Sequence, residues 1–227
     1  MNEDHQTNRV RLKAVYHCLG ELKDKVVFVG GSTVSLYADL PTLNIRPTDD
    51  IDVIIELINY GNRNELEAKL RELGFQNDIE SGIICRYRVQ GIIVDVMPTT
   101  PDSIGFSNRW YPAGFETAID HQLDDVTIKI LNAPVFLSTK LEAFNDRGGD
   151  GRTSHDFEDI VYVLENREQV WKEIENSMEE IKDYLKEEFK RLRGNLSLYE
   201  WIDCHVEFNS PAPTSLILQE IDRFIRE

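Results

Sequence analysis

Residues 26–33 read Val26-Val27-Phe28-Val29-Gly30-Gly31-Ser32-Thr33, and the next acidic stretch reads Asp50-Ile51-Asp52. Four consecutive apolar residues followed by two glycines predict a short buried strand that ends in a tight turn. Serine and threonine directly after the turn favour the start of a helix. Because strand side chains alternate between the two faces of a sheet, Asp50 and Asp52 are expected on one face of a second strand.

A third carboxylate, Asp95, stands alone in the apolar run Ile92-Ile93-Val94-Asp95-Val96-Met97. Buried carboxylates are costly unless they are paired or bind a metal. Two-metal phosphoryl transfer requires several carboxylates that converge on cations, and Mg²⁺ prefers such oxygen ligands. Asp50, Asp52 and Asp95 are therefore predicted to be both the catalytic and the metal-binding residues. The alternative, a solvated acidic turn, is less favoured because apolar residues follow Asp52 and flank Asp95.

The Gly-Gly-Ser-Thr segment is predicted to hold the phosphates of a nucleoside triphosphate. Gly30 and Gly31 allow close approach of the backbone to a ligand. Ser32 adds a hydroxyl, and the amides of Gly31, Ser32 and Thr33 would point at an anion from the start of a helix. A simple turn with no ligand is the alternative interpretation.

The remaining pattern predicts an α+β fold. Residues 1–134 read as a mixed β-sheet with flanking helices, among them a helix over 9–22 and a hairpin formed by 83–89 and 92–97. Residues 135–227 read as a helical domain, with one long amphipathic helix over 170–192 and a last helix that begins near residue 214. We expect the helical domain to close the cleft in which the nucleotide binds.

Composition limits the partners. The 227 residues carry a formal net charge of −16, so the general surface repels polyanions such as nucleic acid. A local basic strip would still allow a tRNA end to dock. No apolar stretch is long enough to cross a membrane, and the acidic N-terminus does not read as a targeting signal. Three scattered cysteines predict reduced core residues, and we expect a cytoplasmic protein.

The order of these features resembles the DNA polymerase β-like nucleotidyltransferase superfamily. More narrowly, Arg46-Pro47-Thr48-Asp49-Asp50-Ile51-Asp52 is similar to the signature of the AbiEii-like abortive-infection toxin nucleotidyltransferases. A second block strengthens the resemblance. It comprises residues 136–144, with Lys140, and residues 154–160, with Asp156, and it resembles the family's lysine-bearing helix and the Asp-x-x-Asp helix that follows it.

The resemblance implies metal-dependent transfer of a nucleoside monophosphate from a nucleoside triphosphate to an acceptor hydroxyl, with release of pyrophosphate. It also implies that Lys140 reaches toward the phosphates and that Asp156 positions Lys140 or the substrate. The residues alone leave other interpretations open, because Lys140 can extend along its own helix into solvent and Asp156 can serve as an acid in a first helical turn.

The sequence does not identify the molecule that accepts the nucleotidyl group. A toxin-type enzyme would modify tRNA and would have a cognate antitoxin protein, whereas an antibiotic-type enzyme would modify a small molecule. A catalytically silent nucleotide-binding module is the third alternative.

Overall fold

The computed structural model describes residues 3–39, 46–56, 63–99, 108–208, 210 and 212–226. The chain falls into two compact units. The first, here called the sheet unit, comprises Met1–Ser35 and Ile45–Asn132; the second, the helical unit, comprises Leu36–Asn44 and Ala133–Glu227.

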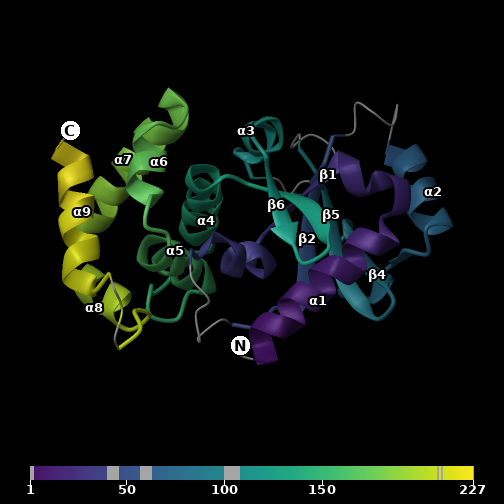
Figure 1. The fold of residues 1–227 in the computed structure, drawn as a ribbon, viewed down its shortest axis with the longest axis horizontal. Helices are drawn as coiled ribbons and strands as arrows, with labels where there is room; N and C mark the ends of the chain where they lie inside the picture. The colour runs from purple at the N-terminus through teal and green to yellow at the C-terminus, as the bar shows by residue number, and fades with distance from the viewer. Residues whose placement is uncertain are drawn as a thin grey trace. The chain divides into compact units, whose positions relative to one another are not determined.

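The sheet unit contains a mixed sheet with the strand order β3-β4-β5-β2-β1-β7-β6. Strands β1, β2, β4, β5 and β6 are labelled in Figure 1. Strand β2 pairs with β5 in parallel, as does β1 with β7, and the other neighbours are antiparallel. The two central strands β1 and β2 are rich in buried Val, Ile and Phe, as expected for strands covered on both faces. The strands are β1 (Val26–Val29), β2 (Asp50–Ile55), β3 (Gln76–Asn77), β4 (Arg86–Val89), β5 (Ile92–Pro98), β6 (Ile119–Leu123) and β7 (Val126–Ile130).

Helices flank this sheet. Helix α1 contacts β2 and β5, and Figure 1 shows it running across the sheet. Leu12, Val15 and Leu19 are fully buried, so this segment contributes the apolar layer that the sheet needs. The helices of the unit are α1 (Glu3–Cys18), η1 (Gly20–Lys25), α2 (Arg63–Glu72), η4 (Ile79–Ser81) and α3 (Tyr111–Glu116), with η2 (Gly31–Tyr37) at its boundary. The predicted α+β fold is confirmed.

In the helical unit, α4 packs against α5, α6 and α7, and α9 packs against α7 and α8. An aromatic cluster of Phe144, Phe157 and Trp201 joins α4, α5 and α8, with ring centroids 5.3–5.9 Å apart. The helices are α4 (Ala133–Arg147), α5 (His155–Asn166), α6 (Val170–Glu175), α7 (Glu179–Arg193), α8 (Leu198–Asp203) and α9 (Thr214–Arg226).

Some sequence predictions are wrong in detail. The long helix over 170–192 is broken into α6 and α7, because Asn176 and Ser177 donate side-chain hydrogen bonds to the carbonyls of Lys172 and Ile174 and so end α6. Met178, at the break, is exposed rather than buried. Of the three cysteines, only Cys85 is buried.

The segment after Gly30 is a 3-10 helix rather than an α-helix.

No helix in the described parts of the chain is both long and apolar enough to cross a membrane.

Candidate active site

The sheet register brings the three predicted carboxylates together on β2 and β5. Asp52 and Asp95 are register partners in this parallel pair, so their side chains leave the sheet on the same face. Asp50 lies two residues before Asp52 and therefore shares that face. We call Asp50, Asp52 and Asp95 the carboxylate trio. The side chain of Asp95 is 11% exposed and that of Asp50 is 36% exposed, so the trio runs from the sheet interior toward solvent.

Gly30 makes room for this arrangement. Val29, the last residue of β1, is the register partner of Asp52, and Gly30 follows with a φ of +74°. A Cβ atom at Gly30 would lie 2.0 Å from Asp52 Oδ2. Both the backbone conformation and the close approach of the carboxylate therefore require glycine here.

Arg86, which the sequence analysis did not select, contacts two members of the trio. It is the first residue of β4 and the antiparallel register partner of Asp95. Its Nε and Nη2 donate to Asp95 Oδ1 and Oδ2 at 2.8 and 2.7 Å, and Nη2 also donates to Asp50 Oδ2 at 3.0 Å. The hydrogen bond with Asp95 raises the pKa of the guanidinium, although desolvation opposes the shift. Arg86 lies within the predicted strand 83–89, and nothing in the local sequence indicates this contact.

The residues before β2 are fixed by α1. The side chain of Asn8, fully buried, donates to the Arg46 carbonyl at 3.2 Å and accepts from the Thr48 amide at 3.2 Å. Arg11 donates to the Thr48 carbonyl, and the Thr48 hydroxyl donates to the Asp50 carbonyl at 3.2 Å. These bonds hold the chain in the position from which Asp50 begins β2.

The Gly-Gly-Ser-Thr turn differs from the prediction in one respect. The Thr33 amide donates to the Gly30 carbonyl at 3.2 Å, and the Thr33 hydroxyl donates to the same oxygen at 2.9 Å. Both groups therefore close the turn rather than point outward. Ser32 is different: its hydroxyl is buried and has no hydrogen-bond partner among the described residues. Such an orphaned polar atom is rare and favours a ligand or water at this position.

Lys140 and Asp156 lie in the helical unit, where they contact each other. The Lys140 Nζ is 2.6 Å from Asp159 Oδ2 and 3.3 Å from Asp156 Oδ1. All three side chains are at most 10% exposed, which argues against a lysine that extends along its helix into solvent. Arg147 also contacts Asp156. Ser154 caps α5 by accepting a hydrogen bond from the Phe157 amide, so Asp156 also lies in a first helical turn.

The carboxylate oxygens of the trio are of the kind that bind cations. One nitrogen of Arg86 lies within 3.0 Å of both Asp50 and Asp95, so a single positive charge already bridges these carboxylates. Within the described ranges, however, no three His, Cys, Asp or Glu side chains lie close enough together to bind an ion as they stand. A divalent cation held by the trio would therefore require the side chains to draw together.

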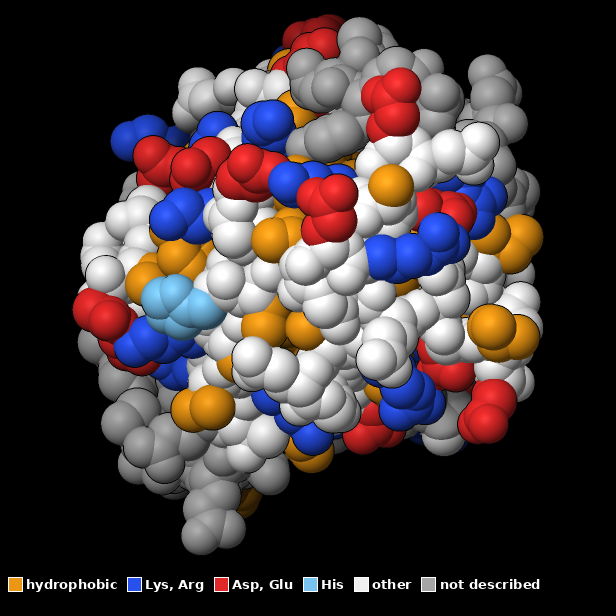
Figure 2. Space-filling view, turned by 90° about the vertical axis from the view of Figure 1, so that its right-hand side faces the viewer, with side chains coloured by type: hydrophobic (Ala, Val, Ile, Leu, Met, Phe, Trp, Pro, Cys, Tyr) orange, Lys and Arg blue, Asp and Glu red, His pale blue; other side chains and the backbone are white. Residues whose placement is uncertain are grey.

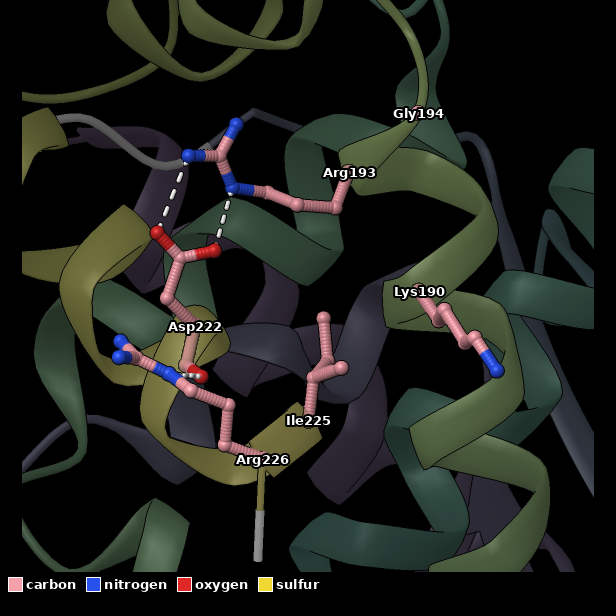
Figure 3. Close-up of a pocket in the computed structure, with 6 residues that line it drawn as sticks. All are labelled: Lys190, Arg193, Gly194, Asp222, Ile225 and Arg226. Carbon is pink, nitrogen blue, oxygen red and sulfur yellow. Dashed lines mark hydrogen bonds and ion pairs between the residues drawn. The ribbon is translucent and has the colours of Figure 1, made fainter.

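A surface hollow of about 570 Å³ in the helical unit offers a different kind of site. Figure 3 shows that Lys190 and Arg193 line it from α7 and that Arg226 lines it from α9. Arg193 forms an ion pair with Asp222, in which Nε donates to Oδ1 at 2.7 Å and Nη2 donates to Oδ2 at 3.0 Å. None of the residues predicted to bind nucleotide or metal lines this hollow. The hollow is therefore not a candidate for the nucleotide or metal site.

A comparison with protein families gives a match over most of the chain. The sequence profile described as "Nucleotidyl transferase AbiEii toxin, Type IV TA system" matches residues 13–224. No curated protein sequence is significantly similar to the chain.

Two solved structures share the fold. The crystal structure of an antigenic nucleotidyltransferase-like protein from Paracoccidioides brasiliensis has a TM-score of 0.50 at 15% identity, over 89% of this chain and 94% of that one. The solution structure of the antibiotic-resistance factor ANT(2'')-Ia has a TM-score of 0.50 at 13% identity, over 82% of this chain and 93% of the other.

Proposed function

Because the chain belongs to the AbiEii nucleotidyl transferase toxin family, we propose that it transfers a nucleoside monophosphate from a nucleoside triphosphate to an acceptor hydroxyl. The observation that carries this proposal is the carboxylate trio, since Asp52 and Asp95 are register partners on one sheet face and Asp50 shares that face. A site of three acids beside a glycine turn suits the handling of phosphates and cations far better than a purely structural role.

In the proposed reaction, the oxygen of the acceptor hydroxyl attacks the α-phosphorus of the nucleotide. A new phosphorus–oxygen bond forms, the bond to the β-phosphate oxygen breaks, and pyrophosphate leaves with the bonding electron pair. The hydroxyl proton passes to a carboxylate, and we assign this role to Asp95. Asp50, Asp52 and Asp95 would hold divalent metal ions, with Mg²⁺ the expected ion, and the bound metal would neutralise charge on the phosphates.

The Gly30–Thr33 turn is the proposed triphosphate site. The orphaned Ser32 hydroxyl supports this assignment, since a phosphate oxygen would supply its missing partner. Thr33 is proposed only to shape the turn, because its amide and hydroxyl both bind the Gly30 carbonyl. Lys140 as a nucleotide-binding residue, with Asp156 as the residue that positions it, stays a prediction; their ion pair supports the positioning part.

Membership of a toxin family favours tRNA as the acceptor and a cognate antitoxin protein as the partner. A small cationic molecule is the second candidate, and the net charge of −16 favours it. Figure 2 shows one face of the molecule, on which the visible Lys and Arg side chains alternate with Asp and Glu rather than forming a continuous basic strip. On this face, therefore, the described residues offer no extended surface for a polyanion.

The test is pyrophosphate release from each of the four nucleoside triphosphates with Mg²⁺, alone and with pooled tRNA or a panel of aminoglycosides. Wild type is compared with Asp52→Asn and with the control Asp120→Asn, which removes an exposed carboxylate on β6. We expect release by wild type and the control and at least a hundredfold loss in Asp52→Asn. The acceptor that stimulates release then shows whether the enzyme modifies tRNA or a small molecule.

A silent nucleotide-binding module would behave differently. It would bind a nucleoside triphosphate without releasing pyrophosphate under any condition, and its affinity would not depend on Asp52. That result would overturn the proposed reaction.

A further inference from the structure

Arg86 is the cation of the carboxylate trio as the structure has it. Its two hydrogen bonds to Asp95 form a bidentate pair, the strongest geometry available to an arginine and a carboxylate. The additional bond to Asp50 joins β4 to β2 across the intervening β5. The guanidinium therefore lies among the carboxylates that the proposed reaction assigns to metal.

The backbone of Arg86 is held independently of its side chain. The Arg86 carbonyl accepts a hydrogen bond from the Asp78 amide at 2.9 Å, and its amide donates to the Ile83 carbonyl at 3.2 Å. The neighbouring pairs Tyr87–Val94 and Arg88–Ile93 continue the ladder between β4 and β5. Because these contacts involve only the main chain, the long side chain can leave the trio without disturbing the strand.

Charge explains why a cation is needed there. Three carboxylates on one sheet face repel one another, and Asp95 is nearly buried, so an uncompensated trio would be unstable. One guanidinium neutralises part of this charge. Since arginine does not lose its proton in proteins, Arg86 stays charged at every pH at which the protein is folded. While the carboxylates are ionised, another cation that competes for them releases Arg86.

We propose that Arg86 is a built-in counter-cation that a divalent metal ion must displace from Asp95 and Asp50 before the site is assembled. This inference rests on the proposed function. It explains why the acids of the described chain do not already form a three-ligand metal site. It also implies that Arg86 weakens the binding of free metal and stabilises the protein when metal is absent.

The experiment is a calorimetric titration of the full chain with Mn²⁺ in the absence of nucleotide. Arg86→Gln removes the counter-cation, and Arg88→Gln is the matched control. Arg88 lies two residues further along β4, on the same face, and its ion pair is with Asp78 rather than with the trio. We expect Arg86→Gln to bind Mn²⁺ about tenfold or more tightly than wild type. Arg88→Gln should stay within about twofold of wild type, because the ion pair that it removes does not involve the trio and its effect on the trio is limited to the net charge.

Three further results test the inference without an activity assay. Arg86→Lys keeps the charge but not the bidentate geometry, so its Mn²⁺ affinity should lie between those of wild type and Arg86→Gln. In metal-free buffer, Arg86→Gln should unfold at a lower temperature than wild type, and Mn²⁺ should raise this temperature more in the variant. Adding Asp52→Asn to Arg86→Gln should abolish the gain in affinity.

Equal Mn²⁺ affinities in wild type, Arg86→Gln and Arg88→Gln would overturn the inference, as would weaker binding by Arg86→Gln, since Arg86 would then hold the carboxylates in position for the metal. A gain that survives Asp52→Asn would place the ion elsewhere and would also overturn it. Failure of the proposed function is a separate result, namely no pyrophosphate release by wild type with any acceptor while the gain in Mn²⁺ affinity is present.

Discussion

Gly30 and Gly91 both have a positive φ, of +74° and +80°, but of the two only Gly30 faces a carboxylate of the trio. A Cβ at Gly91 would meet no atom within 4 Å, whereas one at Gly30 would displace the Asp52 carboxylate. Alanine at either position stores the strain of a left-handed backbone, about 1–2 kcal/mol. The two substitutions therefore separate backbone strain from damage to the site.

We predict that Gly91→Ala lowers the free energy of unfolding by about 1–2 kcal/mol. Gly30→Ala should lower it by more, because its methyl group would also lie 3.0 Å from Asp52 Cβ, which side-chain rotation cannot move away. Only Gly30→Ala should abolish pyrophosphate release. Urea denaturation and the release assay measure the two effects. Activity retained in Gly30→Ala would show that Asp52 is not required in its present position.

Cys85, next to Arg86, makes the stability of the protein depend on pH above about pH 9. Burial, with a smaller contribution from Asp95, raises the pKa of its thiol from 9.0 to about 11. Between these two values the unfolded chain loses the thiol proton while the folded protein keeps it, so the unfolded state binds fewer protons and stability falls as pH rises. The total loss is about 2–3 kcal/mol by pH 11.

Cys85→Ala should therefore decline less steeply than wild type between pH 9 and 11. At pH 7 the variant should be less stable, because a small cavity replaces the sulfur. The gap between the two proteins should narrow as pH rises, and urea denaturation at several pH values measures it. A gap that stays constant with pH would contradict the assignment of this effect to Cys85.

At the scale of elements, α4 and α5 are joined by the buried ion pairs of Lys140 with Asp156 and Asp159. Removing one partner of a buried pair leaves the other charge uncompensated, at a cost of about 3–5 kcal/mol. We predict this loss of unfolding free energy for Lys140→Met. Lys190→Met, whose exposed lysine pairs with Glu187 at 3.9 Å, should change stability by less than about 1 kcal/mol.

Thermal and urea denaturation of the two variants measure this difference. The result also decides how Lys140 activity data are interpreted, because loss of activity in a protein that has lost the α4–α5 contact says nothing about phosphate binding. A Lys140→Met protein as stable as wild type would show that the two aspartates do not depend on the lysine for compensation.

The elements that could be predicted from the sequence are those with strong local patterns. Strand β1 and the β4–β5 hairpin could be predicted because an apolar run, and two β-rich segments on either side of Gln90-Gly91, are local signals. Strand β6, Ile-Asp-His-Gln-Leu over residues 119–123, was missed because it is a largely exposed edge strand whose residues show little β-propensity. The break between α6 and α7 was missed because the apolar spacing continues through it.

The candidate site was predicted only in part for a related reason. Carboxylates within apolar strands are visible in a sequence, and the prediction that they share a strand face follows from alternation. The contact of Arg86 with Asp95 depends on the register of β4 against β5, and that with Asp50 depends on the strand order. Neither register nor strand order is contained in local periodicity, and so Arg86 could not be selected.

At the scale of the whole molecule, the chain enters the helical unit well before α4. Tyr37 is fully buried, and its ring lies 4.5 Å from that of Phe136 on α4. Arg167 donates to the Tyr37 carbonyl at 3.2 Å, and the Asp39 amide donates to the Asn166 carbonyl at 3.0 Å. Residues 36–39 thus complete a core whose other members begin at residue 133.

Two separate cores predict two separate responses to cavity-forming substitutions. Tyr37→Ala should cost about 3–5 kcal/mol and lower hydrogen-exchange protection in α4 and α5, while amides of β4 and β5 keep theirs. Tyr87→Ala, which opens a cavity beside Phe75 in the sheet unit, should give the reverse pattern. Equal loss of hydrogen-exchange protection in both units, from either substitution, would contradict this prediction. It would show that the molecule unfolds as one cooperative body.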